Sequence, residues 1–116
     1  MNNRRSFIIG IKSTKLSVKE KKFLKRYKPW GVILFTRNIK NIEQASNLTF
    51  SIRKIFQDKK YPILIDQEGG RVNRLENIIS FDNLSSEFFG NRYLKKFKKL
   101  KFFYKLFVDK TSYLLK

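Results

Sequence analysis

The segment YPILIDQEGGRVNRL, residues 61–75, joins an apolar run to a loop of charged residues and glycines. The run is short, continuous and rich in isoleucine and leucine, which is typical of a strand in a parallel sheet that is covered on both faces. Pro62 lies near its start, where a strand best tolerates a missing N–H. The sequence therefore predicts a strand at 61–66 that ends in a polar, glycine-containing loop.

Two similar runs precede this segment, FIIGI at 7–11 and WGVILF at 30–35, and both predict strands. Helical patterns separate the three runs. Ser17 and Glu20 have the spacing of a capping box at the start of the first helix, and Asn41 with Gln44 marks the start of the second. Beyond the loop, apolar residues at four-three-four-three spacing predict one long amphipathic helix that runs on to Lys116, with the stripe Tyr93, Phe97, Leu100, Tyr104 and Phe107.

The alternation of strands and helices predicts an α/β fold with parallel strands near 7–11, 30–35 and 61–66 and right-handed crossovers. A complete (β/α)8 barrel needs about 250 residues, and the chain has 116. We therefore expect residues 1–116 to form the first βα units of a truncated TIM-like barrel, as one partial domain. Three strands leave two edges of the sheet unpaired.

The charge of the chain favours polyanionic partners, because 27 Lys and Arg face 9 Asp and Glu, for a formal charge of +18. Cysteine and histidine are absent, which excludes disulfides, thiolate metal sites and a histidine general base. The apolar run at 7–11 is too short for an export signal, and no stretch has the length of a membrane span.

Polar residues follow two of the predicted strands, and in parallel α/β folds such positions share one rim. Asp66, Glu68, Arg71, Arg74 and Arg37 are therefore expected to converge there. A carboxylate accepts from vicinal hydroxyls and an arginine donates to ring oxygens, so the set suits a polyhydroxylated ligand. The alternative is a structural ion-pair network that closes the end of the sheet.

The basic and aromatic stretch at 92–107 allows a second reading of the chain. Lysines on one side and aromatic residues on the other would suit a helix that binds nucleic acid or an anionic membrane. The alternative is an ordinary barrel helix with a solvated lysine face, which the helical period favours. Lysines are also spread along the whole chain rather than gathered into one patch.

The ordered segments WGVILFTRNI, EQASNLTFSIR and PILIDQEGGRVNRL closely resemble the N-terminal part of glycoside hydrolase family 3, in its bacterial β-N-acetylglucosaminidase (β-hexosaminidase) branch. The motif DQEGGRVNR is the most specific part. The resemblance begins at about Phe7 and becomes diffuse after Leu75. It implies a TIM-like barrel that acts in the cytoplasm on N-acetylglucosamine linked to muropeptides, during cell-wall recycling.

The resemblance implies roles for individual residues. Asp66 would bind hydroxyls of the terminal sugar and Arg74 would contact the same sugar. Supporting roles fall to Gln67, Glu68, Gly69, Gly70, Arg71 and Arg37. The expected partner is a saccharide or muropeptide that contains N-acetylglucosamine, with no specific nucleic acid, no membrane span, no metal and no organic cofactor.

The resemblance also shows what this chain lacks. The family's nucleophile is an aspartate on a much later strand, and its acid/base is a histidine, paired with aspartate, on a mobile loop. Since the chain contains no histidine, Asp66 and Glu68 are not assigned as a catalytic couple. No residue of this chain is expected to be catalytic, and the chain alone is expected to be inactive.

Overall fold

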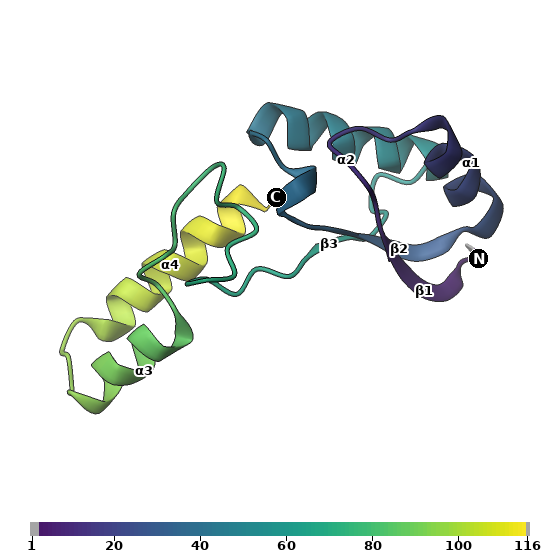
Figure 1. Ribbon diagram of the computed structural model, residues 1–116. Helices are drawn as coiled ribbons and strands as arrows, with labels where there is room; N and C mark the ends of the chain where they lie inside the picture. The colour runs from purple at the N-terminus through teal and green to yellow at the C-terminus, as the bar shows by residue number, and fades with distance from the viewer. Residues whose placement is uncertain (1–2, 116) are drawn as a thin grey trace. The chain divides into compact units, whose positions relative to one another are not determined.

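The computed structural model describes residues 3–115. Its elements follow in the order β1 (Arg5–Gly10), α1 (Val18–Tyr27), β2 (Pro29–Leu34), α2 (Ile42–Phe56), β3 (Ile63–Ile65), α3 (Ser86–Leu94) and α4 (Leu100–Leu114) (Figure 1). One turn of 3-10 helix, Thr36–Asn38, follows β2. The chain divides into two compact units. The first runs to Gln67 and includes Val72–Ser80, and the second combines Glu68–Arg71 with the segment from Phe81 onward.

The first unit holds a parallel sheet in the order β1-β2-β3, as the sequence predicts. Ile9 lies beside Val32, and Val32 beside Ile63. The first two strands begin and end within two residues of the predicted bounds. The third is shorter than the predicted 61–66, because only Ile63–Ile65 pairs with β2 as strand. Tyr61 is buried instead, where its hydroxyl donates to the carbonyl of Pro29 at 2.9 Å.

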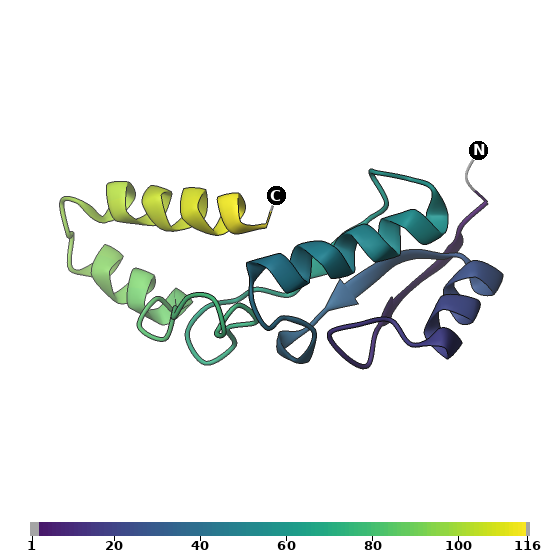
Figure 2. The same cartoon turned by 90° about the horizontal axis from the view of Figure 1, so that it is seen from above.

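Figures 1 and 2 show α1 and α2 on one side of this sheet. Their buried side chains, Leu24 of α1 with Leu48 and Ile52 of α2, form the core with Val32 of β2. The expectation that the strands are covered on both faces is wrong for this unit. Ile8, which alternates with the buried face, is 46% exposed. Three strands do not close on themselves, so the face that a complete barrel turns inward stays uncovered.

Both helices of the first unit begin with the predicted caps. Ser17 Oγ accepts from the Glu20 N–H at 3.2 Å, and the Glu20 carboxylate accepts from the Ser17 N–H at 2.8 Å. Partial burial alone would raise the pKa of Glu20, but hydrogen bonds from Ser17 and from the Lys12 N–H together lower it. At α2 the Asn41 side chain accepts from the Gln44 N–H at 2.8 Å. These caps satisfy N–H groups that have no partner within the helix.

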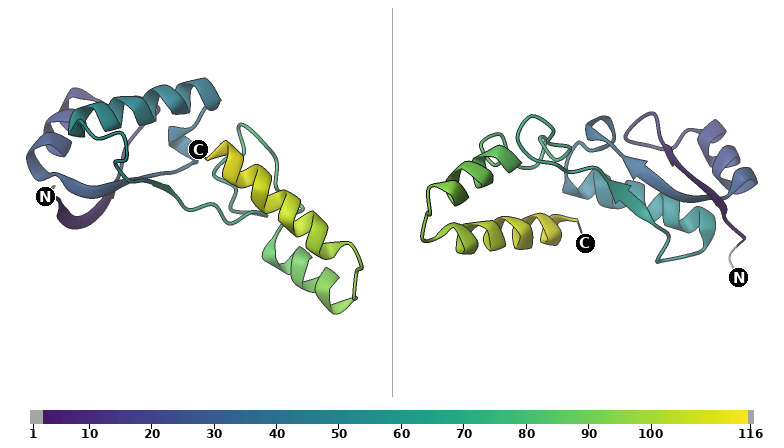
Figure 3. Two further views of the ribbon diagram at one scale, coloured as in Figure 1. Left: turned by 180° about the vertical axis from the view of Figure 1, so that it is seen from behind. Right: turned by 90° about the horizontal axis from the view of Figure 1, so that it is seen from below.

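The second unit corrects the prediction of one helix through residues 93–116. α3 and α4 form a helical hairpin with a break at residues 95–99 (Figure 3). Lys96 adopts a φ of 52°, the Phe97 N–H donates to the Arg92 carbonyl, and the Lys96 N–H to that of Tyr93. This pattern is a Schellman motif, which ends a helix. Like charges four residues apart, as at Lys95 and Lys99, disfavour continuation of the helix.

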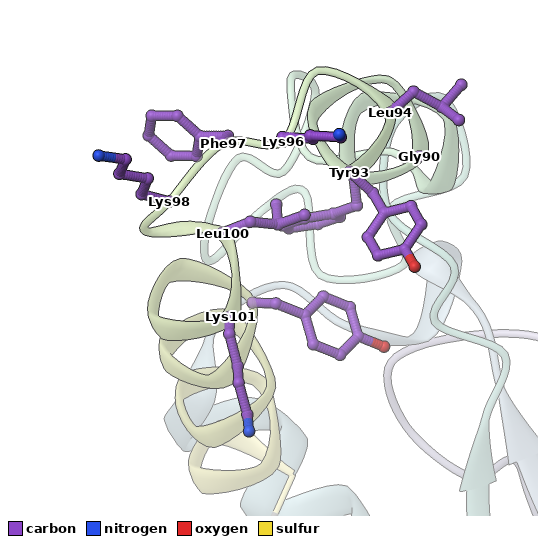
Figure 4. A pocket seen from close by; sticks show the side chains of 10 residues that line it. Gly90, Tyr93, Leu94, Lys96, Phe97, Lys98, Leu100 and Lys101 are labelled. Atoms are coloured by element: carbon purple, nitrogen blue, oxygen red, sulfur yellow. The ribbon is translucent and has the colours of Figure 1, made fainter.

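Part of the predicted apolar stripe packs inside the second unit. The Phe107 ring meets Phe81 edge-on at 5.1 Å between centroids, and Tyr104 meets Phe89 in the same way at 5.1 Å. Tyr93, by contrast, is 73% exposed. An open groove of about 930 Å³ lies between α3 and α4, and its lining includes Tyr93, Leu100 and Tyr104 (Figure 4).

Candidate functional site

The carboxyl ends of the three strands lie at one edge of the first unit. Gly10 ends β1, Phe35 follows β2, and Asp66 follows β3. In parallel α/β folds this edge carries the functional groups. The loop that follows β3 returns Arg74 to the same edge, where its guanidinium faces the Asp66 carboxylate.

Asp66 and Arg74 form a loose and partly solvated ion pair. The Arg74 Nη2 atom lies 3.7 Å from Asp66 Oδ2, and the side chains are 28% and 51% exposed respectively. That separation exceeds hydrogen-bond length, so the carboxylate keeps acceptor sites open. The Arg74 Nε atom is buried and has no hydrogen-bond partner. The half-exposed carboxylate offers acceptor oxygens, and the guanidinium, whose Nη2 faces it, offers N–H donors, as recognition of sugar hydroxyls requires.

Arg37 lies at this edge and contacts the Phe35 ring. Its guanidinium carbon lies 4.6 Å from the ring centroid, and that of Arg74 lies 5.5 Å from the same centroid. Both distances are within cation–π range. The Arg37 Nε–H donates to the Ile11 carbonyl at 3.1 Å. Arg37 therefore joins the end of β1 to the loop after β2.

Asn38 is fully buried under this edge, and the sequence analysis did not single it out. Its Nδ2 donates to the carbonyls of Ile11 at 3.1 Å and Ser13 at 3.0 Å, while its Oδ1 accepts from the Phe35 N–H at 2.9 Å. All of its amide hydrogens and one lone pair are thus used. Its position in the polar segment TRN after an apolar run was the available signal, but nothing in the local pattern distinguishes a buried asparagine from an exposed one.

Gln67 shapes the loop that carries Arg74. Its Oε1 accepts from the Arg74 N–H at 2.9 Å, and its Nε2 donates to Asn73 Oδ1 at 3.1 Å. Asn73, also missed by the sequence analysis, accepts from the Leu75 N–H at 3.0 Å and donates to the Ile79 carbonyl at 2.7 Å. Gln67 therefore acts on Arg74 through the backbone, and its side chain makes these bonds rather than one to Asp66.

The middle of the motif belongs to the second unit. Glu68 and Arg71 are exposed, and Gly69 and Gly70 are buried. The convergence of Glu68 and Arg71 with Asp66 stays a prediction. Within the first unit, Asp66 and Arg74 of the motif form a loose ion pair.

The two glycines occupy conformations that other residues rarely adopt. Gly69 has φ +85° and Gly70 has φ +59°, and a Cβ on Gly69 would lie 2.6 Å from the Leu84 carbonyl oxygen. The Gly70 N–H donates to the Phe81 carbonyl at 3.0 Å. The sequence signal for a tight turn with close backbone approach is therefore correct.

We expect Gly69→Ala to destabilise the second unit by about 2 kcal/mol or more, because both its φ and the Leu84 carbonyl oppose a side chain. Gly90→Ala is the matched control. Gly90 lies within α3 with nothing near its Cβ position, so alanine there should stabilise by roughly 0.5–1 kcal/mol. Urea unfolding of the two variants measures the difference. Equal stabilities would contradict this account of the turn.

Residues 3–115 contain no group of three or more carboxylate side chains placed to hold a metal ion. No helix within the same range has the length and hydropathy to cross a bilayer.

Comparisons with known proteins find similarity to β-hexosaminidases in both sequence and structure. No family model matches the chain. A β-hexosaminidase of Haemophilus influenzae is 43% identical over 74 residues, which are 62% of this chain and 20% of the relative. The structure of NagZ from Neisseria gonorrhoeae, in complex with N-trifluoroacetyl-D-glucosamine, superposes with a TM-score of 0.56 at 36% identity, over 66% of this chain and 22% of that one.

A glycoside hydrolase family 3 β-N-acetylglucosaminidase from Paenibacillus is similar over 65% of this chain and 15% of its own, with a TM-score of 0.57 and 29% identity. The chain thus spans about a fifth of the length of the curated relatives it matches. In sequence and in fold, this chain is similar to the N-terminal portion of β-hexosaminidases of glycoside hydrolase family 3.

Proposed function

We propose that this chain is the sugar-binding N-terminal part of a β-N-acetylglucosaminidase, and that it binds terminal β-linked N-acetylglucosamine without hydrolysing it alone. Residues 1–116 would be part of one TIM-barrel domain. The proposed ligand is a saccharide or muropeptide from cell-wall recycling, and the proposed location is the cytoplasm. Asp66 and Arg74 would bind the sugar, and no cofactor is needed.

The observation that carries this proposal is the half-exposed Asp66 carboxylate with the Arg74 guanidinium 3.7 Å away. The pair is close enough to contact one small ligand and too far apart for a direct hydrogen bond. A sugar with vicinal hydroxyls can bridge such a gap, since it accepts from arginine and donates to a carboxylate.

The remaining motif residues and Arg37 would have supporting roles, which do not require direct contact with the sugar. Gln67 sets the backbone of Arg74 through the hydrogen bond to its N–H. Arg37 ties the loop after β2 to β1. Gly69 and Gly70 permit the turn that leads away from Asp66. Glu68 and Arg71, both exposed, are proposed to have supporting roles.

We expect Asp66→Asn to weaken the binding of N-acetylglucosamine at least tenfold, because a hydrogen bond to a charged group contributes about 1.5–3 kcal/mol. Titration of the sugar into ¹⁵N-labelled protein, followed by NMR, measures the dissociation constant. Asp109→Asn is the matched control, since Asp109 is an exposed residue of α4 that pairs with Lys105. Equal affinities of wild type and Asp66→Asn would contradict the proposal.

The alternative, a basic module that binds nucleic acid or anionic membrane, is not favoured by the comparisons. The lysine-rich stretch is broken at residues 95–99. It therefore lacks the continuous helix on which that alternative depends.

A further inference from the structure

We infer that Phe35 is a positioning residue that holds the Arg74 guanidinium at the rim beside Asp66. The inference rests on the proposed function in one respect, that this rim is where a sugar binds. It adds a residue that lies outside the motif and to which the resemblance assigns no role. Phe35 directly follows β2, whereas the motif follows β3.

The contacts of Arg74 leave few alternatives to the ring. Its Nε is buried and unbonded, and its Nη2 is too far from Asp66 for a hydrogen bond. The guanidinium instead contacts the Phe35 ring, whose centroid lies 5.5 Å from the guanidinium carbon. An arginine side chain has many rotamers, and without such a contact the guanidinium would not stay at one place.

Phe35 is itself well fixed. Its N–H donates to the buried Asn38 side chain at 2.9 Å, and Arg37 contacts its ring at 4.6 Å. The end of β1 carries no side chain that would displace the ring. A Cβ on Gly10 would lie 3.1 Å from Phe35 Cε2, tighter than ordinary contact. The platform is thus already in place without ligand, and preorganisation of this kind lowers the cost of binding.

The test compares Phe35→Leu, which keeps an apolar side chain but removes the aromatic face, with Phe35→Tyr, which keeps that face. Phe50→Leu is the matched control, because Phe50 is 65% exposed on α2 of the same unit. Two quantities are measured in the whole chain. One is the ¹H–¹⁵N signal of Arg74 Nε and its heteronuclear NOE without ligand, and the other is the dissociation constant for N-acetylglucosamine.

We expect Phe35→Leu to broaden the Arg74 Nε signal and to lower its heteronuclear NOE. The variant should also bind N-acetylglucosamine roughly two- to tenfold more weakly, as the range of cation–π energies implies. Phe35→Tyr should restore both, and Phe50→Leu should change neither. A purely structural role for Phe35 would lower stability without a selective change at Arg74.

Two results would overturn the inference. One is an unchanged Arg74 signal in Phe35→Leu, and the other is a folded Phe35→Tyr variant that loses as much affinity for the sugar as Phe35→Leu does. Failure of the proposed function is seen separately. In that case the wild type does not bind N-acetylglucosamine, while the ligand-free Arg74 signal still decides whether Phe35 positions the guanidinium.

Discussion

The purified chain is expected to hydrolyse a chromogenic β-N-acetylglucosaminide no faster than a blank preparation does. The chain has no histidine, so the acid/base that the family resemblance implies is absent. The implied nucleophile lies on a later strand than β3. In enzymes in which the contribution of the catalytic groups has been measured apart from substrate binding, removal of these groups lowers the rate on the order of a million-fold. Loss of the nucleophile and the acid/base together should have an effect of this size.

The assay measures released chromophore over hours, with the Haemophilus influenzae β-hexosaminidase as positive control. Asp66→Asn is assayed in parallel. Turnover that purifies with the chain and disappears in Asp66→Asn would contradict the expectation, since it would make the exposed Asp66 carboxylate a catalyst. Turnover equal in both proteins would identify a contaminating enzyme.

Asn38→Ala is expected to cause the largest loss of stability among single changes at the site, about 3 kcal/mol. The substitution removes the three hydrogen bonds of the fully buried Asn38 side chain. It leaves the Ser13 carbonyl and the Phe35 N–H without this partner, whereas the Ile11 carbonyl still accepts from Arg37 Nε. A buried polar group left unsatisfied costs about 1–3 kcal/mol. Hydrogen exchange of the Phe35 amide should accelerate roughly 100-fold.

Asn47→Ala is the matched control for this measurement. Asn47 is exposed on α2, so its loss should change stability by less than about 0.5 kcal/mol. Urea unfolding and amide exchange are followed on both variants. If Asn38→Ala unfolds at the same urea concentration as Asn47→Ala, the buried amide contributes little, and Phe35 owes its position to other contacts.

The buried residues under the site and the exposed residues at its surface form one chain of contacts. Asn38 fixes the Phe35 backbone, Phe35 faces the Arg74 guanidinium, and Arg74 faces the Asp66 carboxylate. The order predicts how damage should spread. Loss of Asn38 should affect stability and binding. Loss of Asp66 should affect binding alone, because its carboxylate is half-exposed and lies beyond hydrogen-bond distance of Arg74 Nη2.

The local pattern of the sequence determined the elements of the first unit. Continuous apolar runs identified three parallel strands, and the polar pairs Ser17–Glu20 and Asn41–Gln44 located the starts of α1 and α2. The motif after β3 carries most of the resemblance to glycoside hydrolase family 3. Such signals can be read from sequence because strand period, helix period and caps depend on residues a few positions apart.

Only the tertiary structure decided where the helix after the motif breaks and which residues support Arg74. The apolar period continues through residues 95–99, but the Schellman motif at Lys96 ends α3 there. Asn38 bonds a carbonyl 27 residues earlier in the chain, and Phe35 meets a guanidinium from the loop after β3. Partners so distant in sequence leave no periodic trace, because folding alone brings them together.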